Sequence, residues 1–102
     1  MKYANKIGYS DITPFEVVNV ISEKTMEVRE MQATIDPTWK PEFHVGGFSA
    51  HCSNQNEQRW TYESIEDRQV IRIRLRKDGK WYSKQGRHVL ADEPRKFYDY
   101  NF

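Results

Sequence analysis

Three arginines alternate with aliphatic residues between positions 70 and 76, and this spacing favours anion binding. In a strand, Arg72, Arg74 and Arg76 project from one face, about 7 Å apart. A guanidinium fork donates two parallel hydrogen bonds to phosphate oxygens, so a row this short suits a pyrophosphate or a small nucleotide. The alternative is a solvated outer face that is neutralised by carboxylates on neighbouring strands. The candidates for those carboxylates are Glu27, Glu30 and Glu63.

A second candidate site lies in the middle of the chain, where two glycines precede an aromatic ring. Gly46 and Gly47 allow a ligand to approach the backbone closely, and Phe48 places a ring beside it. Asn54 and Asn56 follow with side-chain amides that can read a base edge or ribose hydroxyls. The alternative is an ordinary glycine bulge with Phe48 in the core.

The histidines and the single cysteine do not form a recognisable metal or catalytic motif. His44, His51, Cys52 and His88 match no zinc-ligand spacing, and adjacent residues in a strand point to opposite faces. Cys52 also has no nearby oxyanion or orienting element for nucleophilic catalysis. The Walker A, dinucleotide-binding and zinc-deaminase signatures are absent from the sequence. We therefore expect no catalytic residue, no metal and no cofactor.

The elements that must position these residues are predicted to be strands. Seven Val and seven Ile outnumber two Leu and four Ala, and β-branched residues favour sheet over helix. The sequence predicts one domain over residues 1–102, mainly β (a β-rich α+β class), with an antiparallel sheet, hairpins and at most one or two short helices. Strands are expected at 15–21, 25–35, 58–64, 70–76, 80–83 and 88–90, with hairpin turns at 22–24 and 78–79 and a further turn at 85–87. Residues 1–14 are expected to be irregular, and residues 43–56 to form strand fragments around a loop.

Size and charge limit the classes of protein. The chain has 102 residues and a net charge of +1, too near neutral for a protein that binds long nucleic acid. Residues 1–67 carry six Lys or Arg and eleven Asp or Glu, whereas residues 68–102 carry ten Lys or Arg and four Asp or Glu. The acidic first part can therefore pair with the basic second part, within one fold or between subunits. One cysteine, no signal-peptide pattern and no long apolar run predict a cytoplasmic protein without a membrane segment. A small core predicts a homo-oligomer, at least a dimer.

Several segments together resemble a family of small phage proteins. They are KIGYSDI (residues 6–12), VREM (28–31), GGFSAH (46–51), IRIR (71–74) and PRKFYDY (94–100). The chain is most similar to the phage anti-Thoeris sponges, which sequester cyclic ADP-ribose isomers made by bacterial TIR-domain enzymes; related sponges bind small cyclic oligonucleotides. The resemblance implies a β-rich homo-oligomer in the bacterial host cytoplasm that holds its signal without cleaving it.

The resemblance also implies ligand-binding residues. Sponges of this kind use arginines for the phosphates, an aromatic ring for adenine and an asparagine for polar contacts. By position and motif, the candidates for these roles are Arg29, Phe48, Asn54 or Asn56, and Arg72 or Arg74. Gly47 is a further candidate, because a residue without a side chain would let the ligand approach the backbone next to Phe48.

Two other functions fit the sequence. One is a phage inhibitor that binds a host defence protein directly, as anti-CRISPR or antirestriction proteins do, through the aromatic C-terminus (Phe97, Tyr98, Tyr100 and Phe102). The other is a weak single-stranded nucleic-acid binder that uses Arg72, Arg74, Trp81 and Tyr82, although the net charge of +1 argues against it.

Overall fold

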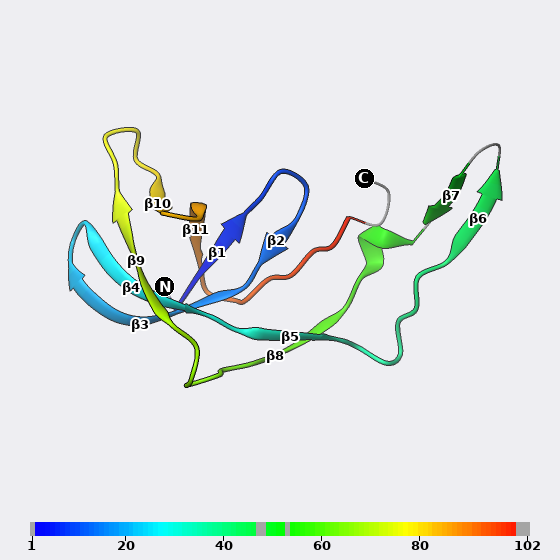
Figure 1. Cartoon of the computed structure of the whole chain (residues 1–102), viewed down its shortest axis with the longest axis horizontal. Helices are drawn as coiled ribbons and strands as arrows, with labels where there is room; N and C mark the ends of the chain where they lie inside the picture. Colours follow the sequence, from blue (N-terminus) through cyan, green and yellow to red (C-terminus); the bar gives the residue numbers. More distant parts are fainter. Residues whose placement is uncertain (1, 47–48, 53, 100–102) are drawn as a thin grey trace.

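The fold is mainly β, as the sequence predicts. The computed structural model describes residues 2–46, 49–52 and 54–99 (Figure 1), and the only helical segment in this part of the chain is the three-residue 3-10 turn η1. Among these residues no helix has the length and apolar character needed to cross a bilayer. The elements are β1 (Tyr3–Ile7), β2 (Ile12–Thr13), β3 (Phe15–Ser22), β4 (Thr25–Glu30), β5 (Gln32–Ile35), β6 (Phe43–Gly46), β7 (Ser49–Cys52), η1 (Gln55–Glu57), β8 (Trp60–Glu63), β9 (Val70–Leu75), β10 (Trp81–Ser83) and β11 (Gly86–Ala91).

Six strands form a closed antiparallel barrel in the order β1-β3-β4-β9-β10-β11. The ladder between β11 and β1 closes it and covers all of β1, with Tyr3 opposite Ala91 and Ile7 opposite Arg87. On its other side β1 pairs with β2 and then with β3. Apart from the closing β11–β1 pair and the short β2 between β1 and β3, neighbouring barrel strands are consecutive in the chain except β4 and β9, between which a long insertion leaves the barrel.

The barrel interior is small and aromatic. Its core consists of Ala4, Phe15, Val28, Ile73 and Trp81, all at most 9% exposed. His88 is also buried and packs edge-on against the Phe15 ring, with 5.0 Å between ring centroids. Trp81 faces this interior, so it does not belong to the outer surface that a nucleic-acid-binding role for it would require.

The insertion forms an arm that extends away from the barrel (Figure 1). β5 and β8 form its two-stranded ladder, and the β6–β7 hairpin lies at the far end. In the ladder Ala33 lies opposite Tyr62 and Ile35 opposite Trp60, which gives the arm one apolar face. The arm makes the molecule elongated, with extents of 51 × 29 × 21 Å.

The C-terminal segment joins the arm to the barrel. Phe97 and Ile12 exchange two main-chain hydrogen bonds of 3.0 and 3.1 Å. Next to them, the Lys96 N–H donates to the Tyr62 hydroxyl (2.9 Å) and the Tyr98 N–H donates to the Gln58 side-chain oxygen (3.0 Å). Residues 96–98 are thus hydrogen-bonded both to Ile12, beside the barrel, and to Gln58 and Tyr62 in the arm.

Three expectations for individual segments were wrong. Residues 3–7 and 12–13 were expected to be irregular, but they form β1 and β2, because barrel closure supplies partners for a polar strand. The strand expected over 25–35 is two strands, since the chain leaves the barrel at Met31, which is buried where the arm begins. The turn expected at 85–87 lies earlier, because β11 already begins at Gly86.

Candidate functional site

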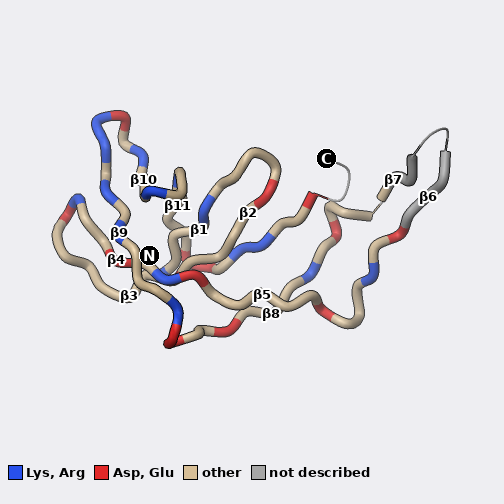
Figure 2. Tube along the Cα trace, viewed as in Figure 1, with Lys and Arg blue, Asp and Glu red and all other residues tan. Residues whose placement is uncertain are grey.

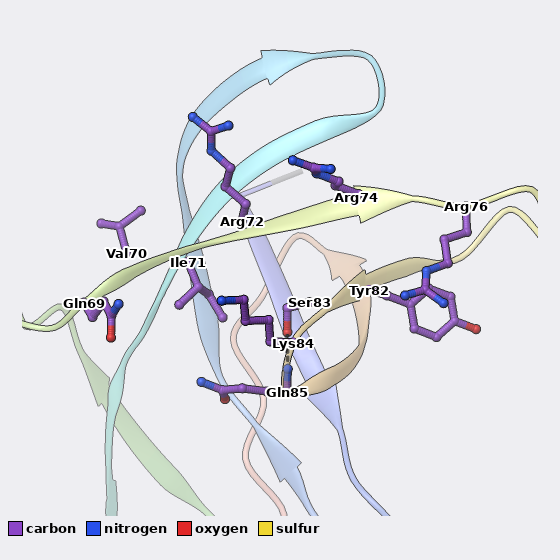
Figure 3. A pocket seen from close by; sticks show the side chains of 10 residues that line it. All are labelled: Gln69, Val70, Ile71, Arg72, Arg74, Arg76, Tyr82, Ser83, Lys84 and Gln85. Atoms are coloured by element: carbon purple, nitrogen blue, oxygen red, sulfur yellow. Dashed lines mark hydrogen bonds between the residues drawn. The ribbon is translucent and has the colours of Figure 1, made fainter.

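The arginine row lies on the outer surface of the barrel, on β9 and just beyond it. Ile73 points into the core, so Arg72, Arg74 and Arg76 point outward (Figure 3). In the ladder with β10, Arg74 lies opposite Tyr82, and in the next ladder Tyr82 lies opposite Arg87. The registers therefore place an aromatic ring between two arginines on one face.

A groove lies beside this row, because β10 is too short to cover the N-terminal half of β9. β10 has three residues and β9 has six, so the first half of β9 faces the turn after β10 instead of a strand. The groove has a volume of about 830 Å³, within the range of small-molecule sites. Its lining residues, drawn in Figure 3, are Gln69, Val70, Ile71, Arg72, Arg74, Arg76, Tyr82, Ser83, Lys84 and Gln85.

The groove is cationic, and few of its charges are neutralised. Figure 2 shows the basic residues that follow one another along β9 and the start of β10. Arg72 approaches Glu27 at 3.7 Å, but its side chain is still 56% exposed. Arg74 and Lys84 have no carboxylate within ion-pair distance among the described residues. The expected alternative is thus correct for Glu27, and only for one arginine of the row.

Tyr82 is held in place on this surface by two contacts. Its hydroxyl donates to Asp78 (2.9 Å), and the Arg76 guanidinium lies 4.5 Å from its ring centroid. The hydrogen bond to Asp78 raises the pKa of Tyr82, and the Lys80 N–H together with the same hydroxyl lowers the pKa of Asp78. Asp78 is therefore an anion bound by its own hairpin, and it forms no ion pair with Arg74 or Lys84 among the described residues.

Ser83 connects the groove wall to the barrel core. The Nδ1–H of His88 donates to the Ala4 carbonyl (3.0 Å), because a carbonyl can only accept. Nε2 consequently accepts the Ser83 hydroxyl (2.8 Å), and the Ser83 oxygen accepts the N–H of Gln85 (3.1 Å). Burial lowers the pKa of His88. The neutral imidazole thus fixes the turn that forms one side of the groove.

The predicted ligand residue Arg29 is bound by protein groups. It lies on β4, and its guanidinium donates to Glu16 (2.8 Å) and to the Glu66 carbonyl (3.3 Å). The Arg29 and Glu16 side chains are each only 15% exposed. Arg29 therefore serves as a structural ion pair, whereas Arg72 and Arg74 border the groove together.

The other predicted ligand residues belong to the arm. The Asn54 amide donates to the Lys40 carbonyl (2.7 Å), and its oxygen accepts the Glu42 N–H (2.8 Å), which fixes the base of the β6–β7 hairpin. Asn56 is exposed in η1. Gly47 and Phe48 lie outside the described residues. In Figure 1 this hairpin is at the opposite end of the molecule from β9, so the predicted site is divided within one chain.

Several groove residues were not among the predicted site residues. From the sequence, Lys84 and Gln85 are ordinary turn residues, and Gln69 is the last residue of a loop. Their only sequence signal is the short spacing between the Asp78-Gly79 turn and Gly86, which makes β10 shorter than β9. Strand lengths in a closed barrel thus decide which turn residues border the arginine row.

Within the described ranges, no three His, Cys, Asp or Glu side chains gather closely enough to hold a metal ion. Comparison of the chain with protein-family models, with curated proteins and with solved structures gives no match. The groove beside β9 is therefore the feature from which its function is inferred.

Proposed function

We propose that the protein binds and sequesters a small cyclic nucleotide-type signal, a cyclic ADP-ribose isomer or a cyclic oligonucleotide, without cleaving it. The observation that carries this proposal is the groove beside β9, whose lining includes Arg72, Arg74 and Lys84. A phosphate there gains charge-assisted hydrogen bonds without first displacing a buried ion pair. The resemblance to phage sponges supplies the class of ligand and the role in the bacterial host cytoplasm.

The chemistry of the groove is that of binding rather than reaction. Its polar side chains are arginine, lysine, amides, a hydroxyl and a tyrosine, and its lining residues include no carboxylate. Of the carboxylates nearby, Asp78 accepts the Tyr82 hydroxyl and Glu27 accepts the Asn19 amide. A sponge needs tight and slowly released binding, and such a groove provides positive charge without a general base. Assembly into a homo-oligomer would bury the groove further and strengthen these contacts.

Calorimetry with cyclic ADP-ribose isomers and cyclic di- and trinucleotides tests the proposal. We expect one of them to bind more tightly than about 10 µM and to be recovered intact after the complex is denatured. The double substitution Arg72→Ala/Arg74→Ala should weaken binding by about one to two decades, because charged hydrogen bonds to phosphate are lost. Lys24→Ala, on an exposed turn, is the matched control and should bind like the native protein. Binding that is absent, or that survives the double substitution, contradicts the proposal.

A second candidate function, direct inhibition of a host defence protein, is favoured by a different surface. β3 exposes Val18, Val20 and Ile21, which are 37%, 60% and 44% accessible, and exposed apolar clusters favour protein contacts. The C-terminal aromatics first considered for this role are partly used within the fold, since Phe97 pairs with Ile12. Val20→Asp would abolish inhibition of this kind while nucleotide binding is unaffected.

A further inference from the structure

Part of β9 has main-chain groups that no strand pairs. β9 runs from Val70 to Leu75, but its ladder with β10 reaches only Arg74 and Leu75. The first half of the strand borders the cationic groove instead. An unpaired edge presents N–H donors and C=O acceptors to whatever occupies the space beside it.

The alternation of the strand determines which groups face the groove. The Leu75 N–H donates to a carbonyl on the β4 side (2.9 Å), and the Arg76 N–H donates to a carbonyl on the β10 side (3.0 Å). Residues two apart in a strand direct their main-chain groups to the same side. Val70 and Arg72 therefore direct both N–H and C=O into the groove, where no strand of the described chain pairs with them.

The two ends of this edge differ in chemistry. Val70, Arg72 and Arg74 extend from the same side of β9 (Figure 3), so this border of the groove is apolar at Val70 and cationic at the two arginines. Val70 is 40% exposed, so an apolar surface is available beside its main-chain groups. Two residues of strand separate Val70 from Arg72 by about 7 Å. This border of β9 therefore offers an apolar surface for a flat group next to a cationic surface for anions.

We propose that a nucleobase pairs by its edge with the main chain of Val70, while the phosphates of the same ligand lie against Arg72 and Arg74. This deepens the proposed function and depends on it. An adenine edge presents an amino donor beside a ring-nitrogen acceptor, which complements the C=O and N–H of one strand residue. A small planar group fits better than a peptide strand, because only two residues of the edge are free and strand addition uses a longer row.

Ligand chemistry tests the pairing without changing the protein. Calorimetry compares ADP-ribose, N6,N6-dimethyl-ADP-ribose and inorganic pyrophosphate on the native chain. We expect ADP-ribose to bind about tenfold more tightly than its dimethyl derivative, because methylation removes the amino donor to the Val70 carbonyl. Pyrophosphate alone should bind most weakly, and an acidic pentapeptide should not displace ADP-ribose.

A matched pair of variants tests the same contact from the protein side. Val70→Pro removes the N–H that faces the groove and spares the ladder to β4, since proline is tolerated where a strand's N–H is unpaired. Val70→Ala removes the side chain and keeps the N–H. ADP-ribose should bind about tenfold more weakly to Val70→Pro than to Val70→Ala, and N6 dimethylation should cost little more in the proline variant.

The outcomes separate this inference from the proposed function. Equal binding of ADP-ribose and its dimethyl derivative, equal binding by the two Val70 variants, or displacement of ADP-ribose by the peptide overturns the base pairing alone. If ADP-ribose binds no more tightly than pyrophosphate, the base pairing is also overturned, and the groove is a site for anions only. If neither these probes nor any cyclic nucleotide binds, the proposed function fails and the pairing fails with it.

Discussion

Arginines of one sheet face have different roles because their register partners differ. Arg29 and Arg72 both point outward from neighbouring strands. Glu16 lies opposite Arg29 and forms a 2.8 Å ion pair with it, whereas Glu27 only approaches Arg72 at 3.7 Å. A charged hydrogen bond in a poorly solvated position contributes more than an exposed pair does. The more buried pair therefore stabilises the barrel, and the more exposed arginine can bind a ligand.

His88 should make the stability of the barrel depend on pH. Burial lowers its pKa in the folded chain, whereas in the unfolded chain the pKa is about 6.5. Above that pH both states hold a neutral imidazole, and as the pH falls the unfolded chain takes up the proton first. The free energy of unfolding should thus decrease as the pH falls from about 6.5 towards the lower folded pKa.

Urea unfolding at pH 7.5 and pH 5.5 measures this effect, with His88→Gln as the comparison. The variant should be less stable at pH 7.5, because the bonds to Ala4 and Ser83 are changed, but it should lose less stability on acidification. An equal loss in both proteins would assign the pH dependence to other groups.

At the scale of elements, the sequence predicts strands well where their inner and outer residues differ clearly. The segment 70–76 alternates aliphatic and basic residues, and β9 forms there with the inward and outward faces as predicted. β1 could not be recognised in the same way, since Ala4 is its only fully apolar inward residue and Asn5 and Lys6 follow it. Its partners in β11 are 80 to 88 residues away, and such long-range pairing leaves no local pattern.

The candidate site was predictable in part for the same reason. The arginine row follows from local alternation, so Arg72 and Arg74 could be found from the sequence. The groove depends on where β10 stops, and the ion pair of Arg29 depends on the register between β3 and β4. Neither property is encoded within a single segment, so Lys84 and Gln85 could not be connected to the row.

The turn that ends β10 depends on a glycine. Gly86 has φ +138°, a conformation that L side chains rarely adopt, and a Cβ there would meet no atom within 4 Å. Gly86→Ala should therefore destabilise the protein by about 1–3 kcal/mol through backbone strain alone. Gly79, in the other hairpin turn, has φ +79°, where asparagine is tolerated.

Gly79→Asn is accordingly the control for Gly86→Ala, and it should lose less than about 1 kcal/mol in urea unfolding. Because Gly86 follows Lys84 and Gln85, the alanine variant should also weaken ligand binding in the groove. If Gly86→Ala is as stable as the native protein, the turn accepts a side chain and does not require the positive φ of Gly86.

At the scale of the whole molecule, one end of the chain holds two distant parts together. The arm leaves the barrel after β4 and returns before β9, and its ladder has only two strands, which is marginal without further support. The segment 92–99 supplies that support through Asn5 and Ile12 on the barrel and Tyr62 on the arm. The opposite charges of the two halves also meet within the barrel, where Glu27 lies opposite Arg72.

Deletion of residues 97–102 should therefore loosen the arm and leave the barrel folded. Hydrogen exchange should become faster for the amides of β5 and β8, because the bonds from Phe97 and Tyr98 to Ile12 and Gln58 are lost. Amides in the β1–β11 ladder should keep their protection, since that ladder does not involve the deleted segment. Tyr62→Phe removes only the hydroxyl that accepts the Lys96 N–H and should produce a smaller change of the same kind. Tyr9→Ala, at a fully exposed position, should change nothing, and loss of protection throughout the barrel after the deletion would mean that the two parts fold as a single unit.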